Sequence, residues 1–206
     1  MAEITAQMVK DLREMTGAGP LDCKKALEQF AGDMNKAADF LREKGLAKAA
    51  KKLGAGRTMN EGLIETYLHF NKRLGVMVEV NCETDFVAAT DAFKNFCREL
   101  AMHIASLSPE YVRREDVPEA IVAKEREIQT HRAVEEGKPP AIAEKVAEGR
   151  MAKFFEEIVL MEQQYFRDDS KTIQQFLQET VAEVGESIQI ARFVRFALGQ
   201  GGADTE

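Results

Sequence analysis

The sequence predicts an α+β fold, in which helices precede, cover and follow a small antiparallel sheet of about three strands. Changes of hydrophobic period support this prediction. Residues 1–53 space their apolar side chains as helices do, with glycines between the apolar stretches. Residues 61–82 and 187–198 instead alternate from one face to the other, as strands do. Helical spacing returns between these two segments, which indicates helices packed on the sheet.

Three short helices are predicted in residues 1–53. Thr5 is a candidate N-cap of the first helix, and Pro20 suits the first position of the second. Asp33 is a candidate cap of the third helix, which Gly45 is expected to end. Such helices, joined by tight glycine turns, make a compact bundle that is marginal in size. A helical extension that becomes a glycine-containing linker is expected to follow.

A β-hairpin is predicted next, with strands at about 61–70 and 74–82. One face of the first strand carries Leu63, Glu65, Tyr67 and His69, and the other face carries Ile64, Thr66, Leu68 and Phe70. The apolar face of the second strand carries Val76, Val78, Val80 and Cys82. After Thr84, a single long amphipathic helix is expected to cover the sheet until Ser108 breaks it.

An antiparallel helical hairpin is predicted over residues 118–163. It is expected to project, because its first arm has few apolar positions. Thr172 and Gln175 have the spacing of a capping box, which begins a further helix that Gly185 ends. The last strand then completes the sheet with unbroken alternation. One of its faces is expected to carry Ile188, Ile190, Arg192, Val194 and Phe196.

The predicted organisation is a helical bundle at 1–53, a linker at 54–60, a core at 61–198 and a disordered tail at 199–206. With 206 residues and 45% hydrophobic content, the chain can bury a substantial core. We expect a cytoplasmic protein, because no stretch approaches the roughly 20 apolar residues of a membrane span and no signal peptide is evident. The cysteines are too few and scattered for a disulfide framework. We expect Cys23, Cys82 and Cys97 to be reduced and buried.

The formal charge of −7 argues against direct binding of nucleic acid, which depends on many Lys and Arg contacts to phosphates. The charge is uneven, however. Residues 1–59 hold eleven Lys or Arg and only eight Asp or Glu. This basic excess is either a solvated helix face running into a linker or a docking patch for an acidic protein.

No catalytic or metal-binding constellation is evident, so no cofactor, no metal and no enzymatic activity are predicted. The histidines His69, His103 and His131 lie on different predicted elements and at no metal-ligand spacing. No phosphate-binding loop is present. The carboxylates of Glu83 and Asp85 are the one candidate acid–base pair, and they have no partner base.

Two separated motifs carry a resemblance to a known family. Residues 12–19 with 22–27 form the first motif, and residues 78–87 form the second, a strand that stops at a polar turn and restarts as a helix. In order and position they closely resemble the bacterial elongation factor Ts family. Shorter echoes appear at 148–151 and 192–196, so the resemblance covers nearly the whole chain.

The resemblance implies a guanine-nucleotide exchange factor whose partner is GDP-bound elongation factor Tu. It also implies that residues 1–53 are a ubiquitin-associated-like bundle that docks on this partner. The family's Thr-Asp-Phe-Val turn is exposed, and its Phe enters a pocket of the partner near Mg²⁺ and the nucleotide phosphates. The partner-binding residues implied at matching positions are Thr84, Asp85, Phe86, Val87, His69, Leu12, Pro20, Leu21, Lys24 and Gly185.

Other interpretations of these residues remain open. From spacing alone, Phe86 would begin a buried helical stripe, and His69 would be a solvated strand histidine. At the docking loop most relatives carry two bulky flexible residues, whereas this chain has the stiffer pair Pro20 and Leu21. A non-catalytic helical-bundle adaptor is the alternative function, and an enzyme with a carboxylate site at Glu83 and Asp85 is the third.

The chain holds one core unit where longer relatives hold two. The resemblance to short members implies a homodimer and a 2:2 complex, in which one subunit supplies Phe86 and the other His69. A small sheet with an uncovered face and edge strands gives this expectation modest physical support.

Overall fold

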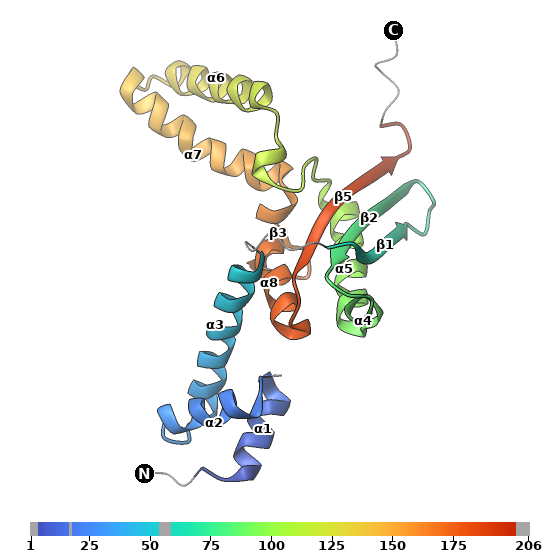
Figure 1. Ribbon diagram of the computed structural model, residues 1–206. Helices are drawn as coiled ribbons and strands as arrows, with labels where there is room; N and C mark the ends of the chain where they lie inside the picture. Colours follow the sequence, from blue (N-terminus) through green and yellow to red (C-terminus); the bar gives the residue numbers. More distant parts are fainter. Residues whose placement is uncertain (1–3, 17, 54–58, 201–206) are drawn as a thin grey trace.

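The computed structural model describes residues 4–16, 18–53 and 59–200, and the predicted α+β fold is confirmed (Figure 1). Its first three helices are α1 (Ala6–Thr16), α2 (Pro20–Gln29) and α3 (Met34–Leu53). Thr5 caps α1 as predicted, because its Oγ1 accepts a hydrogen bond from the Met8 N–H at 3.2 Å. The three helices enclose a small core of their own, made of Leu12, Cys23, Ala26, Leu27, Ala37 and Leu41. The predicted linker falls mostly on residues 54–58, which lie outside the described residues, as do 201–206 of the predicted tail.

The prediction that Gly45 ends the third helix is wrong, because α3 continues to Leu53. Gly45 instead lies against helix α8 (Ile173–Val184), where an added Cβ atom would stand 3.6 Å from the Cβ of Ala182. One turn earlier, the Arg42 guanidinium pairs with Glu179 of α8 at 3.0 Å. The glycine therefore brings two helices close together, and tertiary packing outweighs its low helix propensity.

A three-stranded antiparallel sheet forms the centre of the chain. Its strands are β1 (Glu61–Leu68), β2 (Leu74–Cys82) and β5 (Ile188–Ala197), in the order β1-β2-β5. Glu61 lies opposite Cys82, and Leu68 lies opposite Gly75. The alternation predicted for β1 and β2 matches the burial of their side chains, with Val78, Val80 and Cys82 fully buried.

The unbroken alternation predicted for the last strand is wrong. Glu79 pairs with Arg192 but the next residue, Val80, pairs with Ile190, so β5 holds an extra residue at Ala191. Such a bulge reverses the facing of every later side chain. Ile190 is accordingly buried, whereas the later residues Arg192, Val194 and Phe196 are exposed on the outer face.

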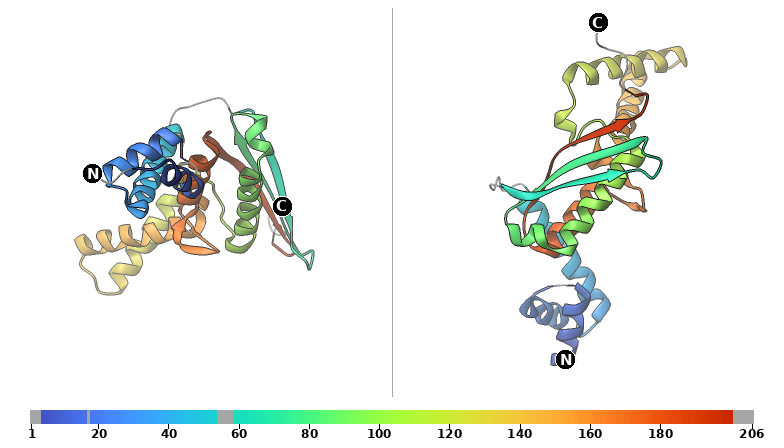
Figure 2. Two further views of the ribbon diagram at one scale, coloured as in Figure 1. Left: turned by 90° about the horizontal axis from the view of Figure 1, so that it is seen from below. Right: turned by 90° about the vertical axis from the view of Figure 1, so that its right-hand side faces the viewer.

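Helices cover only one face of this sheet, as Figure 2 shows. Helix α5 (Asp91–Leu107) packs on the inner face, together with the short α4 (Asp85–Ala89). The single long helix predicted after Thr84 is therefore two helices, separated at Thr90, whose side chain caps α5 by accepting from the Phe93 N–H. The outer face, with the hairpin turn and the end of β5, exposes a set of large apolar side chains. We call this set the outer sheet face: Ile64, Leu68, Phe70, Met77, Val194, Phe196 and Leu198.

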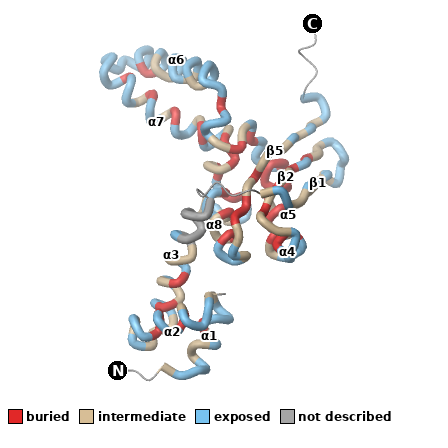
Figure 3. The backbone as a smooth tube through the Cα atoms, in the orientation of Figure 1, coloured by how far each residue is buried: buried red, intermediate tan, exposed pale blue. Residues whose placement is uncertain are grey.

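The helical hairpin projects from the core as predicted (Figure 1). It consists of α6 (Glu119–Glu135) and α7 (Pro140–Ile158), flanked by the 3₁₀ turns Arg114–Asp116 and Leu160–Glu162. Only its base has a buried cluster, formed by Val117, Met151, Phe155 and Val159. Two short strands, β3 (Gln164–Tyr165) and β4 (Asp168–Thr172), were not predicted. Figure 3 shows the buried residues gathered where α5, α8 and the sheet meet, while the hairpin is mainly exposed.

Gly62 is expected to tolerate no side chain. Its φ is +148°, and an added Cβ atom would stand 2.2 Å from the carbonyl oxygen of Val80 on the neighbouring strand. Because that oxygen belongs to the backbone of a central strand, Gly62→Ala should lower the free energy of unfolding by about 2 kcal/mol or more. Urea denaturation measures the loss. Gly149→Ala is the matched control, since Gly149 lies in α7 with no atom within 4 Å and should gain about 0.5–1 kcal/mol.

A buried histidine ties β3 to the core. His103 is 0% exposed, its Nε2 lies 2.9 Å from Oε1 of Gln163, and its Nδ1 accepts from the Phe166 N–H at 3.3 Å. Nδ1 therefore has no room for a proton, and burial lowers the pKa of His103 to about 4.

Because the pKa of His103 is low, the free energy of unfolding is expected to fall in mild acid. Between pH 6.5 and about 4 the unfolded chain binds a proton at His103 that the folded chain excludes. Unfolding therefore becomes easier as pH falls, by up to about 1.4 kcal/mol per pH unit. The free energy of unfolding, measured by urea denaturation between pH 7 and 5, should fall with this slope in the wild type. The same slope is expected for His131→Gln, a control at an exposed site, and a smaller slope for His103→Gln. Equal slopes in all three proteins would contradict the assignment.

Candidate functional site

The turn between β2 and α4 holds an aromatic ring out in solvent. Thr84 is the N-cap of α4, and its Oγ1 accepts from the Val87 N–H at 3.4 Å. Val87 is 7% exposed and anchors the short helix in the core, whereas Phe86 is 81% exposed. The interpretation of Phe86 as the start of a buried stripe is therefore wrong, because Val87 occupies that place. Asp85, at the first position of the helix, is also exposed.

A second turn, between α8 and β5, holds this turn in place. The carboxylate of Glu186 accepts from the Thr84 N–H at 3.1 Å and from the Thr84 hydroxyl at 2.9 Å. In the opposite direction, Glu83 accepts from the Ser187 N–H at 2.9 Å. Gly185, which precedes these residues, ends α8 in the left-handed conformation with φ +77° and is exposed. The structure therefore brings Gly185 and the Thr84 turn together from positions about one hundred residues apart.

The residues predicted at the docking loop are mostly accessible. Pro20 and Leu21 begin α2, and Leu21 is 68% exposed. Lys24 is exposed and lies 3.9 Å from Glu28, an ion pair within the same helix. Leu12 is different, because it is 0% exposed in the bundle core and can act only by supporting the surface above it. Met15, which is not among the predicted contact residues, is 61% exposed near the end of α1.

His69 lies in the turn between β1 and β2. Its N–H donates to the Leu74 carbonyl at 2.9 Å, and its Nδ1 lies 2.8 Å from the Tyr67 hydroxyl. Its ring centroid is 4.5 Å from that of Phe70, which is 87% exposed. Tyr67 and His69, predicted on one face of the first strand, are therefore in contact at the tip of the hairpin.

The two ends of the hairpin separate His69 from Phe86. The strand β2 runs from the His69 turn at Leu74 to Cys82, just before the Phe86 turn. At about 3.3 Å per residue, that strand alone holds the two ends roughly 25 Å apart. Figure 1 shows α4 at one end of the sheet, on the side of the helical bundle, and the β1–β2 turn at the other. Within one chain the structure does not bring the two residues together.

The chain matches known proteins over almost its whole length. The family model described as elongation factor TS matches residues 2–200. Elongation factor Ts of Thermoanaerobacter sp. (strain X514) is 58% identical over 198 residues, which cover 96% of each chain. Elongation factor Ts of Carboxydothermus hydrogenoformans is 57% identical over 203 residues, covering 98% of this chain and 93% of the relative.

The chain belongs to the elongation factor Ts family.

The elongation factor Ts match includes every candidate residue, since it begins before α1 and ends after β5. A third relative, from Geobacter metallireducens, is 54% identical over 98% of this chain. The family predicted from the two motifs is thus confirmed.

Histidine, cysteine and carboxylate side chains are the other candidates for chemistry in this elongation factor Ts family member. Among the described residues, no group of three His, Cys, Asp or Glu side chains is placed to hold a metal ion, and no helix is long and apolar enough to cross a membrane. Glu83 accepts a hydrogen bond from the Ser187 N–H. All three cysteines are buried and free, as predicted, and burial raises the pKa of the Cys82 and Cys97 thiols.

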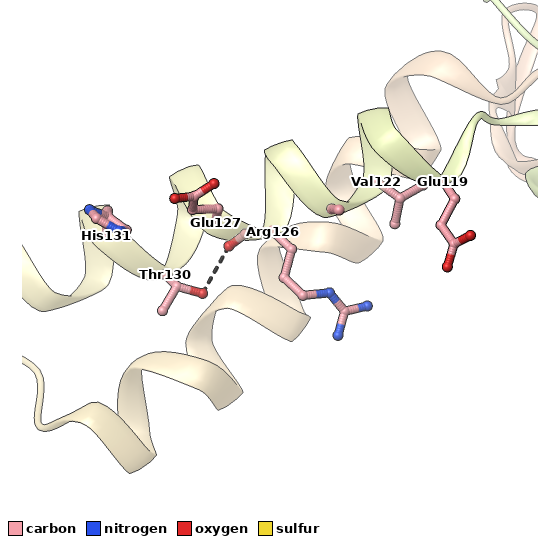
Figure 4. A pocket seen from close by; sticks show the side chains of 7 residues that line it. Glu119, Val122, Arg126, Glu127, Thr130 and His131 are labelled. Atoms are coloured by element: carbon pink, nitrogen blue, oxygen red, sulfur yellow. Dashed lines mark hydrogen bonds between the residues drawn. The ribbon is translucent and has the colours of Figure 1, made fainter.

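Two hollows lie away from the Phe86 turn. One, of about 490 Å³, follows helix α6, where Figure 4 shows the Thr130 hydroxyl bonded to the Arg126 carbonyl. Its walls also carry Glu127 and His131, and all of them come from the one helix. The other, of about 550 Å³, lies between the base of the helical hairpin and the start of β5, where Arg113 and Gln189 line it. Neither hollow includes Glu83 or Asp85, so neither gives those carboxylates a substrate pocket.

Proposed function

We propose that this elongation factor Ts family member is a guanine-nucleotide exchange factor of translation elongation. It binds GDP-bound elongation factor Tu in the cytoplasm and promotes release of GDP, without catalysing a reaction itself. Membership of the family supports the role in elongation. The observation that carries the exchange role is the Phe86 ring, 81% exposed on a capped and anchored turn.

The mechanism is a wedge coupled to nucleotide binding. If the factor weakens GDP binding by some ratio, bound GDP weakens binding of the factor by the same ratio. Full burial of a Phe side chain in the partner yields about 1.5–3 kcal/mol, similar to the 1–3 kcal/mol typical of allosteric coupling. Insertion of Phe86 near the Mg²⁺ and phosphate site is therefore sufficient to drive most of the distortion that releases GDP.

Docking is assigned to the helical bundle of residues 1–53. Pro20, Leu21 and Lys24 present an exposed edge with one apolar and one cationic side chain, and buried Leu12 supports it. Pro20 fixes the backbone at the start of α2, so this edge is stiffer than a pair of methionines would be. The bundle has its own core, which suits a separate docking unit.

The same proposal includes a homodimer and a 2:2 complex. The outer sheet face exposes apolar side chains that a second copy would cover, and such a large exposed apolar patch is typical of a protein interface. A two-fold axis perpendicular to the strands places the His69 end of one sheet beside the Phe86 end of the other. Elongation factor Tu would then contact Phe86 of one subunit and His69 of its partner, which a single chain holds roughly 25 Å apart.

Release of a fluorescent GDP analogue from purified elongation factor Tu tests this function. Addition of the chain should accelerate release, with saturation as the factor concentration rises. Light scattering at micromolar concentration should give the mass of two chains. If the chain binds elongation factor Tu without accelerating GDP release, the adaptor hypothesis is supported instead. If the chain is a monomer, the proposed site formed by Phe86 and His69 of two subunits is wrong.

A further inference from the structure

Two neighbouring turns are joined by a reciprocal pair of carboxylate contacts. Glu83, before the Thr84 turn, accepts from the N–H of Ser187. Glu186, before Ser187, accepts from both the N–H and the hydroxyl of Thr84. Each turn therefore supplies one carboxylate to the backbone of the other. Hydrogen bonds to a charged acceptor are roughly twice as strong as neutral ones, so this is a firm connection.

The Glu186 contact also controls the cap of α4. The Thr84 hydroxyl donates a hydrogen bond to Glu186 at 2.9 Å. This orients a lone pair of Thr84 Oγ1 toward the Val87 N–H. That cap sets the direction in which the first residues of α4 leave the sheet. Because α4 has only five residues, its own hydrogen bonds hold the direction of Phe86 weakly.

Glu186 is also connected to the helical bundle. It follows α8, which ends at Gly185, and α8 carries the Glu179 carboxylate that pairs with Arg42 of α3. Lys171 completes this link, with its Nζ 2.7 Å from Glu179. Helix α8 therefore connects the helical bundle to Glu186, which holds the turn that carries Phe86.

We propose that Glu186 is a positioning residue for exchange, which fixes the Thr84 turn so that Phe86 projects at a set angle from the docked bundle. This inference rests on the proposed function. Glu186 acts through its contacts with Thr84.

Three substitutions test the inference. Glu186→Ala removes both acceptors, Glu186→Gln keeps an amide oxygen for the Thr84 N–H, and Glu186→Asp shortens the reach by one methylene. The control is Glu183→Ala, since Glu183 is an exposed carboxylate in the last turn of α8, three residues before Glu186. The measurements are the GDP release rate at saturating factor, the half-saturating factor concentration and the exchange rate of the Thr84 amide proton.

Glu186→Ala should lower the saturating release rate about fivefold to tenfold, with less than about a twofold change in the half-saturating concentration. Glu186→Gln should retain most of the rate, Glu186→Asp should be intermediate, and Glu183→Ala should equal the wild type. A purely structural role would lower stability without separating rate from half-saturation. If Glu186→Ala folds and releases GDP at the wild-type rate, or if Glu186→Gln loses as much as Glu186→Ala, the inference is wrong.

The amide measurement separates this inference from the function on which it rests. In Glu186→Ala the Thr84 amide should exchange about tenfold faster than in the wild type, while amides in the centre of α5 keep their rates. If the wild type fails to release GDP but the amide responds as expected, the exchange function is wrong and the contact stands. If the amide of Glu186→Ala stays as protected as in the wild type, the contact itself is refuted. Should Glu186→Ala fold poorly, Glu186→Asp decides by the same two measurements.

Discussion

Phe86→Ala is expected to lower the rate of GDP release at saturating factor about tenfold to a hundredfold. The ring is 81% exposed in the free chain, so its removal takes almost nothing from the fold. In the complex the same ring would be fully buried, and its 1.5–3 kcal/mol would be lost from the state in which GDP leaves. The free energy of unfolding should change by less than about 0.5 kcal/mol.

The release of a fluorescent GDP analogue, measured over a range of factor concentrations, checks this expectation. Phe86→Leu is the graded control, because it keeps apolar bulk without the ring and should fall between the two proteins. Asp85→Asn tests whether the neighbouring exposed charge contributes separately. A Phe86→Ala protein that binds elongation factor Tu and still releases GDP at the wild-type rate would refute the wedge.

Phe196→Asp is expected to convert the proposed dimer into folded monomers. Phe196 is 72% exposed on the outer sheet face, opposite Gly75 of β2, and the two-fold axis would bury it in both subunits. Loss of two buried rings corresponds to about 3–6 kcal/mol, or a dissociation constant raised by roughly a hundredfold to ten-thousandfold. The charged side chain stays solvated in the monomer, so the fold should persist.

Sedimentation equilibrium measures this change in assembly. Ile142→Asp is the matched control, since Ile142 is 49% exposed on α7, away from the sheet, and should leave the dimer intact. GDP release should fall together with dimerisation in Phe196→Asp, because a monomer no longer offers His69 and Phe86 to one partner molecule. A Phe196→Asp protein that remains dimeric would show that the outer sheet face is not the interface.

Most of the fold was predictable because its signals are local. The strands β1 and β2 alternate over eight and nine residues, and the cap of α8 is a capping box formed by Thr172 and Gln175. The bulge at Ala191 was not predictable, since a two-against-one pairing depends on the neighbouring strand rather than on the residues of β5. The prediction that Gly45 ends the third helix was wrong for the same reason, because the contact that favours the helix at Gly45 comes from Ala182 of α8.

The candidate site divides in a similar way. The residues of the Thr84 turn could be predicted from the sequence motif. The spacing of apolar residues favoured a buried Phe86, because that prediction assumed one continuous helix where the structure has α4 and α5. The break at Thr90 shifts the phase, so that Val87 points inward. The contact between Thr84 and Glu186 could not be foreseen from a pattern, because 102 residues separate the two side chains.

The close approach of Gly45 to Ala182, beside the Arg42–Glu179 ion pair, fixes the packing of α3 on α8. In Gly45→Ala the added methyl group would lie at an ordinary contact distance from Ala182. In Gly45→Leu the larger side chain would push α3 away from α8 and rotate the helical bundle relative to the sheet. A small rotation at that contact displaces Leu21, many residues away along the chain. The side chain at position 45 therefore helps to set the orientation of the helical bundle relative to the sheet, although it lies far in the sequence from both Leu21 and Phe86.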